Sequence, residues 1–99
     1  MAPVDPRKRV AIHYCPKCRW LARAAWVAQE LLATFDSELS EVALVPSEVA
    51  GRFDVHVGEV VVFSRKAEGG FLQPKDLKQR VRDAVAPQRD LGHADKPRD

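Results

Sequence analysis

The sequence predicts an α/β domain with a mixed four-stranded sheet and two main helices in the order β-α-β-β-β-α. Three observations predict this class. Strand-like apolar segments occupy 9–14, 39–45, 53–57 and 60–63, and two segments with helical apolar spacing lie at 17–35 and after Pro74. A strand, a helix and a further strand in this order favour a right-handed parallel crossover. The length of 99 residues allows a single hydrophobic core and therefore one domain.

The first strand and first helix follow from two different apolar periods. Residues 9–14 alternate so that Val10, Ile12 and Tyr14 share one face, and Pro16 ends strand pairing because it lacks an N–H group. From 17 to 35, apolar side chains recur at helical spacing and predict one buried stripe made of Leu21, Ala24, Ala25, Ala28, Leu31, Leu32 and Phe35.

The second half of the chain predicts a hairpin followed by a helix. The apolar run 39–45 is closed by Pro46, and 53–57 alternates as a half-buried strand. Gly58-Glu59 suits a type II′ turn into the strand 60–63, and 66–70 reads as a loop. The last helix starts at Pro74, ends before Pro87 and has the apolar face Leu77, Val81, Ala84 and Val85.

This order of elements matches a compact thioredoxin-like fold. The domain is expected to span 9–87, with 1–8 as a flexible lead-in and 88–99 as a solvated C-terminal tail that is a candidate to fold back onto the domain.

Composition excludes several classes of protein. Sixteen Lys and Arg against fourteen Asp and Glu give a net charge of +2, which is too balanced to predict nucleic-acid binding. The longest apolar runs, Ala24–Ala28 and Val60–Phe63, are too short to cross a membrane. No apolar signal segment opens the chain, so we expect a cytoplasmic protein in a reducing environment.

Both cysteines lie in one motif, Cys15-Pro16-Lys17-Cys18, at the predicted junction of the first strand and first helix. This spacing at a helix start places the two sulfur atoms on one side, near enough for a disulfide. The positive end of the helix, with Arg9, Lys17 and Arg19 nearby in sequence, favours the thiolate form. The motif therefore predicts thiol–disulfide exchange, with Cys15 and Cys18 as the catalytic pair.

Two other interpretations compete with redox chemistry. A Cys-x-x-Cys pair is half of a tetrahedral zinc site, but the remaining candidates are the isolated histidines His13, His56 and His93, so no metal site is predicted. The thiols could also be inert. A purely structural disulfide is disfavoured, because closing so short a loop adds little stability.

Several blocks of the sequence resemble the bacterial branch of the selenoprotein W-like (Rdx) family, with coverage of about 9–95. The blocks are Tyr14-Cys15-Pro16-Lys17-Cys18-Arg19-Trp20-Leu21, Arg23-Ala24-Ala25-Trp26, Gln29-Glu30-Leu31-Leu32, Glu41-Val42-Ala43-Leu44-Val45-Pro46, Gly51-x-Phe53-Asp54-Val55, Ser64-Arg65-Lys66, Gly69-Gly70-Phe71, Leu77-Lys78-Gln79-Arg80-Val81-Arg82-Asp83 and Asp90-Leu91-Gly92-His93.

The resemblance implies a thioredoxin-like fold and a thiol-based redox role that is often linked to glutathione. Selenium-containing members carry selenocysteine at the position of Cys18, so this chain is expected to be a cysteine-containing homologue. The chain departs from the family pattern at Gly58-Glu59, where relatives more often have glycine second, and at Leu72, where relatives commonly have proline.

The attacking sulfur is open to two interpretations. General thioredoxin mechanics favour Cys15 as the more exposed thiolate, with Cys18 resolving the mixed disulfide. The selenocysteine position in relatives favours Cys18 instead, and we give Cys18 the preference.

Other side chains have a functional and a structural interpretation each. Pro16, Lys17, Trp20 and Phe71 are candidates to tune the thiols or to contact a partner, whereas core packing equally explains Trp20 and Phe71. Trp26 falls opposite the predicted apolar stripe, which favours exposure.

Three histidines also have two interpretations each. His13 could tune the thiols but is expected to be a hydrogen-bonded strand residue, and His56 is expected to be structural or solvated. His93 lies in the predicted tail.

The sequence thus predicts a thiol–disulfide oxidoreductase that exchanges with protein thiols or with glutathione as a co-substrate, without a tightly bound cofactor. A redox-gated binding module without turnover is the alternative. Partners are expected to be proteins bearing thiols or disulfides, neither nucleic acid nor membrane, and a weak homodimer is a candidate assembly.

Overall fold

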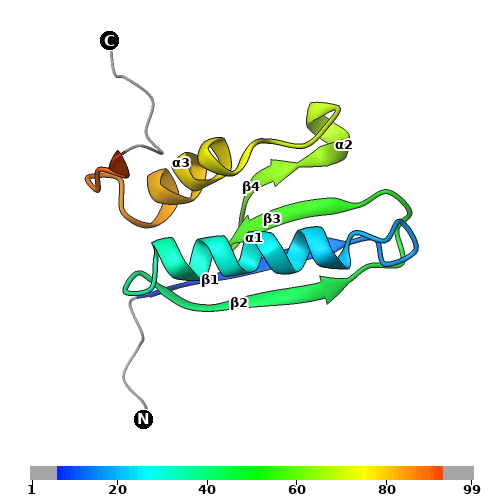
Figure 1. Cartoon of the computed structure of the whole chain (residues 1–99), viewed down its shortest axis with the longest axis horizontal. Coiled ribbons are helices and arrows are strands. Elements are labelled where there is room, and N and C mark those ends of the chain that lie inside the picture. Colours follow the sequence, from blue (N-terminus) through cyan, green and yellow to red (C-terminus); the bar gives the residue numbers. More distant parts are fainter. Residues whose placement is uncertain (1–6, 93–99) are drawn as a thin grey trace.

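The computed structural model describes residues 7–92 and shows four strands and three helices (Figure 1). Residues 1–6 of the predicted lead-in and 93–99 of the predicted tail, including His93, lie outside the described residues. The elements are β1 (Lys8–Tyr14), α1 (Leu21–Thr34), β2 (Leu39–Pro46), β3 (Phe53–Val57), β4 (Val60–Ser64), α2 (Arg65–Glu68) and α3 (Pro74–Val85).

The sheet is mixed and has the strand order β2-β1-β3-β4. β1 pairs in parallel with β2, which requires the crossover through α1, and pairs antiparallel with β3 on its other side. β3 and β4 form the hairpin, in which Val57 pairs with Val60. Gly58 has φ +57° and Glu59 is not among the described residues with positive φ, which is the pattern of the predicted type II′ turn.

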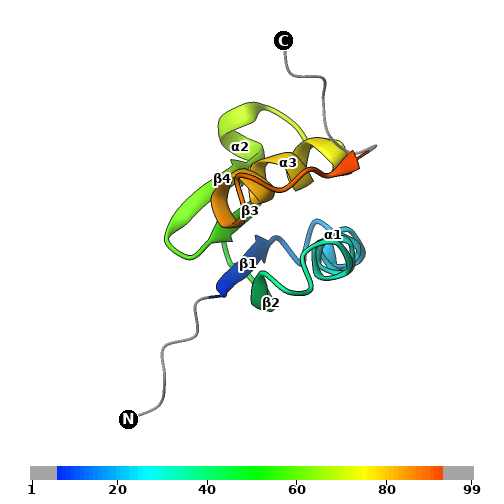
Figure 2. The same cartoon turned by 90° about the vertical axis from the view of Figure 1, so that its left-hand side faces the viewer.

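Both long helices cover the same face of the sheet. α1 packs on β1 and β2, whereas α3 packs on β3 and β4, and Figure 2 shows the two helices side by side with the opposite face bare. The core between the layers is formed by alternate strand residues and one stripe of each helix, and its largest fully buried side chains are Phe35, Phe53, Ile12, Leu31, Val10, Val55 and Val81. The fold is the expected thioredoxin-like α/β arrangement.

The first helix differs from its prediction in start and in face. It begins at Leu21 rather than at residue 17, because the preceding residues form a turn. Its buried residues are Ala24, Val27, Ala28 and Leu31, so Val27 replaces the predicted Leu21, Ala25 and Leu32, all of which are exposed. Both stripes have helical spacing, and contact with the sheet and with α3 selects between them. Trp26 is 46% exposed, as its position on the wheel predicts.

A short helix replaces the loop predicted at 66–70. The Ser64 side chain accepts a hydrogen bond from the Ala67 backbone N–H at 3.4 Å, which caps the start of α2. Gly69, with φ +78°, ends the helix in the left-handed conformation. The described residues after Pro87 contact the domain: Leu91 packs against the core, and Arg89 pairs with Glu38 at 2.7 Å.

Candidate redox site

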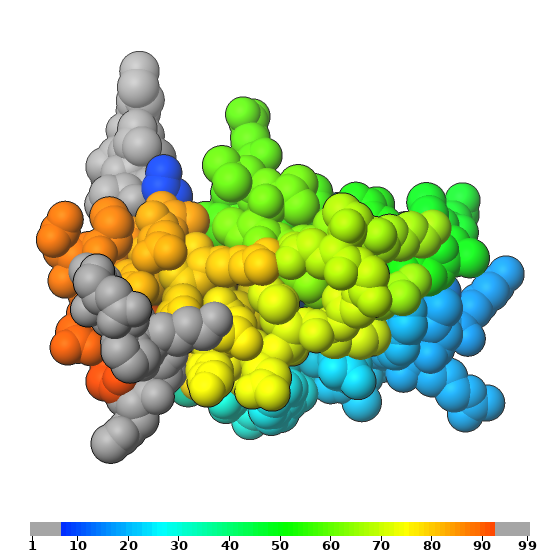
Figure 3. Space-filling view, turned by 90° about the horizontal axis from the view of Figure 1, so that it is seen from above, coloured from blue at the N-terminus to red at the C-terminus, as the bar shows by residue number. Residues whose placement is uncertain are grey.

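Cys15 and Cys18 form a disulfide directly after β1, with their Cα atoms 5.3 Å apart. The four-residue turn 16–19, which contains Cys18, is closed by a hydrogen bond that the Arg19 N–H donates to the Pro16 carbonyl at 3.0 Å. Strand pairing fixes the start of this turn, because Tyr14 pairs with Pro46 of β2 on one side and with Phe53 of β3 on the other. The site therefore lies at the carboxyl end of the central strand, at one end of the molecule (Figure 3).

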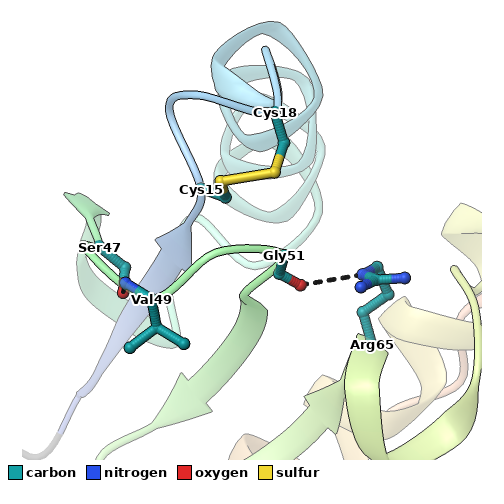
Figure 4. Close-up of a disulfide and its surroundings, with 6 residues drawn as sticks. All are labelled: Cys15, Cys18, Ser47, Val49, Gly51 and Arg65. Carbon is teal, nitrogen blue, oxygen red and sulfur yellow. Dashed lines mark hydrogen bonds between the residues drawn. A yellow bond between two sulfur atoms is a disulfide. The ribbon is translucent and has the colours of Figure 1, made fainter.

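The two cysteines differ in exposure. Cys15 is 2% exposed, whereas Cys18 is partly exposed. This order of exposure is opposite to the one that general thioredoxin mechanics favours, in which Cys15 is the more exposed of the two. The reason is that Cys15 still continues from the buried strand, while the turn carries Cys18 outward above the sheet (Figure 4). Cys18 is consequently more accessible from the solvent than Cys15.

The helix terminus lies further along the chain than the sequence predicts. Arg19 adopts φ +62°, a left-handed conformation that costs a non-glycine residue about 1–2 kcal/mol. This residue redirects the chain into α1, whose first residue is Leu21. The start of α1 has neither a side-chain cap nor an acidic residue in its first turn, so its positive end is not neutralised locally. Cys18 lies two residues before the N-cap Trp20, near this positive end.

The loop between β2 and β3 faces the disulfide. Ser47 follows β2, and its N–H donates to the Tyr14 carbonyl at 2.8 Å, which ties the loop to the strand that carries Cys15. The Val49 N–H donates to Ser47 Oγ at 3.1 Å. Figure 4 shows this loop passing below the disulfide toward Gly51. The loop and the turn enclose a cleft lined by Cys15, Pro16, Lys17, Ser47, Glu48 and Ala50.

The loop is also anchored to the second half of the domain. Gly51 has φ +75°, and its carbonyl accepts a hydrogen bond from Arg65 Nε at 3.0 Å. Arg65 is the first residue of α2. An ideal Cβ on Gly51 would lie 3.0 Å from Arg65 Nη2, so the absence of a side chain allows this close approach.

An aromatic cluster connects the turn to the segment after α2. The Trp20 ring lies 5.2 Å from Phe71 and 6.3 Å from Phe53, both edge to face, and Phe53 lies 5.2 Å from Phe71. Two guanidinium groups flank the cluster. Arg23 lies 4.0 Å above the Phe71 ring, and Arg65 lies 4.9 Å from the Trp20 ring.

The predicted site residues therefore fall into two neighbouring groups. Pro16 and Lys17 are exposed and line the cleft beside Cys15. Trp20 and Phe71 contact each other next to the turn, at a position that combines core packing with partial exposure. Sequence reasoning missed Arg23, Arg65 and Gly51, which long-range folding brings beside these residues.

His13 and His56 lie on the bare face of the sheet, where their rings are 4.6 Å apart. Burial lowers the pKa of His13 below its ordinary value, the Arg52 cation and His56 lower this pKa further, and Asp54 opposes them. His56 Nε2 is buried without a hydrogen-bond partner among the described residues. Tyr14 faces the core, so alternation along β1 places the side chain of the adjacent His13 on the opposite face of the sheet.

Two further properties concern the described residues alone. Within 7–92, no three His, Cys, Asp or Glu side chains come together as potential metal ligands. None of the helices in this part of the chain combines the length and the apolar character needed to span a bilayer.

Together, the fold and the site define a thioredoxin-like protein with a Cys-x-x-Cys pair at the end of its central strand. Residues 9–83 match the model of the Rdx family. The chain belongs to the Rdx family and is selenoprotein W-like, as the sequence resemblance predicts. The family implies a thioredoxin-like redox role.

Solved structures of two bacterial proteins are similar to this chain. A Bordetella parapertussis protein is 52% identical with a TM-score of 0.76, over 80% of this chain and 99% of its own. A selenoprotein W-related protein from Vibrio cholerae is 47% identical with a TM-score of 0.76, over 79% of this chain and 96% of its own. No curated protein matches the chain.

Proposed function

We propose that the protein is a thiol–disulfide oxidoreductase that cycles Cys15 and Cys18 between disulfide and dithiol. The observation that carries this proposal is the unequal exposure of two bonded cysteines beside an open cleft. Such an arrangement gives one sulfur for attack and one protected sulfur for resolution. In the reducing cytoplasm, where we place the protein, thiols are available as exchange partners.

Reduction of the disulfide proceeds in two exchanges. The thiolate of an incoming thiol attacks Cys18 Sγ, the Cys15–Cys18 bond breaks, and Cys15 leaves as a thiolate that takes up a proton. A second thiolate then attacks the sulfur of the bound thiol, which releases a low-molecular-weight or protein disulfide and leaves Cys18 reduced. In total, one protein disulfide and two thiols become one protein dithiol and one disulfide.

Oxidation of the dithiol runs the same steps in reverse. The Cys18 thiolate attacks a substrate disulfide and releases one thiol, and Cys15 then attacks Cys18 and releases the other. Cys15 lines the cleft but is only 2% exposed, which limits its direct encounter with the substrate while leaving it close to Cys18. Lys17 and Arg19 place positive charge beside the thiolates, which stabilises the charged form. Protein thiols and glutathione are the proposed exchange partners.

Single cysteine variants test this order of attack. Cys15→Ser leaves the exposed sulfur without its resolving partner and is expected to accumulate a mixed disulfide at Cys18 with oxidised glutathione, measured by intact mass. Cys18→Ser leaves only the buried sulfur and is expected to form the adduct at least tenfold more slowly. The double variant is the control for non-covalent retention. If both single variants catalyse turnover like the wild type, the proposal is wrong.

Redox-gated binding is the second candidate because the turn contacts the aromatic cluster. Trp20 follows Cys18 by two residues and packs against Phe71, so a change in the turn on reduction would reach an exposed part of the surface. Partner capture that differs between the oxidised and reduced protein, in the absence of turnover, would favour this candidate over the oxidoreductase.

A further inference from the structure

Positive charge without a carboxylate partner is concentrated around the disulfide. Six cations of the described residues form ion pairs with acidic side chains, and these are Arg9, Arg52, Lys78, Arg80, Arg82 and Arg89. Lys17, Arg19, Arg23 and Arg65 pair with no carboxylate among residues 7–92, and the same is true of Lys8, Lys66 and Lys75. The acid that lines the cleft is Glu48. A chain of nearly balanced charge thus has an electropositive redox end.

Arg23 and Arg65 differ from ordinary surface cations because aromatic rings hold both. The Cζ atom of Arg23 lies 4.0 Å and that of Arg65 lies 6.0 Å from the centroid of the same ring, Phe71, so these atoms are at most 10 Å apart. Arg65 is further fixed by the hydrogen bond from its Nε to the Gly51 carbonyl. Its terminal nitrogens are free of other bonds to the described protein, and a guanidinium presents a planar fork that fits a carboxylate.

We propose that Arg23 and Arg65 form a carboxylate-binding pair beside the disulfide, which selects thiols and disulfides that carry carboxylates close to the reacting sulfur. This inference rests on the proposed exchange at Cys18. Carboxylates at alternate positions of an extended peptide are about 7 Å apart, a separation that a pair of groups within 10 Å accommodates. Glutathione and an acidic protein segment share this chemistry, since both place carboxylates within a few bonds or residues of a cysteine.

The test compares the rates at which matched thiols reduce the oxidised protein. Glutathione is compared with its dimethyl ester, which has no carboxylate charge, and a hexapeptide with aspartate on either side of its cysteine is compared with the asparagine version. Each rate is divided by the rate of the same thiol with hydroxyethyl disulfide, because carboxylates also change the intrinsic reactivity of a thiol. Dithiothreitol serves as the uncharged reductant.

The variant Arg23→Gln/Arg65→Gln removes the pair, and Lys8→Gln/Arg9→Gln is the control. The control removes the same number of charges at the start of β1, seven and six residues before Cys15 and roughly 20 Å away along the strand. Figure 3 shows the start of β1 and the turn 16–19, which contains Cys18, toward opposite ends of the molecule. Because Arg65 also anchors the loop at Gly51, the rate with dithiothreitol reports any structural loss.

In the wild type we expect the charged thiol to reduce the disulfide about tenfold faster than its neutral counterpart at low ionic strength. This ratio is the one expected when two partly exposed arginine–carboxylate pairs form. Raising the salt concentration should reduce this preference. The Arg23→Gln/Arg65→Gln variant should bring this preference to about one when each rate is divided by the dithiothreitol rate of the same variant, and the control should keep the preference. A preference for glutathione over its dimethyl ester identifies the substrate as a small acidic thiol. A preference for the aspartate peptide over the asparagine peptide identifies it as an acidic protein segment.

Three results would overturn the carboxylate-binding pair: equal wild-type rates for charged and neutral thiols, a preference that survives in Arg23→Gln/Arg65→Gln, or an equal loss in the control. These results leave the proposed function standing as long as dithiothreitol and neutral thiols exchange with the disulfide. If no thiol reduces it, the proposed function itself is wrong.

Discussion

Gly51→Ala tests how the loop that faces the disulfide is anchored. Gly51 has φ +75°, and a new Cβ would lie 3.0 Å from Arg65 Nη2 and 3.4 Å from Lys66 Cε. Gly69 offers a matched control at the end of α2, because it has φ +78° in the left-handed conformation but nothing within 4 Å of its ideal Cβ. Alanine at either position has the same backbone strain, but only alanine at Gly51 displaces the Arg65 guanidinium.

The expected magnitudes follow from these two environments. A left-handed alanine costs about 1–2 kcal/mol at either glycine, less roughly 0.4–1 kcal/mol from the reduced entropy of the unfolded chain. Gly51→Ala also crowds Arg65 Nη2 and so strains the 3.0 Å hydrogen bond from Arg65 Nε to the Gly51 carbonyl, whose complete loss would cost about 0.5–1.5 kcal/mol. Gly51→Ala is therefore expected to destabilise the protein more than Gly69→Ala does, by up to about 1.5 kcal/mol.

Urea denaturation of the oxidised protein measures this difference, provided that the slope of the free energy of unfolding against urea is the same in both variants. Oxidised protein is required so that the disulfide constrains every sample equally. If Gly51→Ala is no more destabilising than Gly69→Ala, the Arg65 contact does not anchor the loop and the reasoning is refuted.

Three further predictions concern residues near the site. Arg19→Gly should be about 1 kcal/mol more stable than Arg19→Ala in thermal unfolding, because glycine adopts φ +62° without the cost that alanine has; equal stabilities would contradict this. Because burial lowers the pKa of His13, the folded state binds its proton less readily than the unfolded state, so the contribution to stability is complete above the ordinary pKa of 6.5 and decreases as the pH falls below it. His13→Gln should flatten this part of the pH profile, and an unchanged profile would refute the assignment. Reduction should change the fluorescence of Trp20, which packs beside the turn, so Trp26→Phe should keep the signal and Trp20→Phe should lose it.

Much of the fold was predictable because strand and helix patterns agree along the chain. The alternation through Val10, Ile12 and Tyr14 predicts the buried face of β1, and the Gly58-Glu59 turn predicts the hairpin. The start of α1 was not predictable, because the left-handed conformation falls on Arg19, whereas glycine or asparagine is the usual signal for it.

The candidate site was predictable only as far as short-range spacing reaches. Cys15 and Cys18 are identified by their spacing, and the contact between Trp20 and Phe71 needs only a fold that returns the chain to the turn. The positions of Arg23 and Arg65 around Phe71 could not be predicted, because they depend on a short helix that reads as a loop. The relative exposure of the cysteines likewise depends on the path of the turn above the sheet.

Cys15 and Cys18 are proposed to cycle together between disulfide and dithiol, and a redox titration measures this directly. The protein is equilibrated in glutathione buffers of increasing reducing strength, unreacted thiols are alkylated, and intact mass counts them. The account predicts one reversible transition in which Cys15 and Cys18 gain or lose reactivity together as a two-electron couple. Separate transitions for the two cysteines, or a disulfide that never re-forms after reduction, would contradict it.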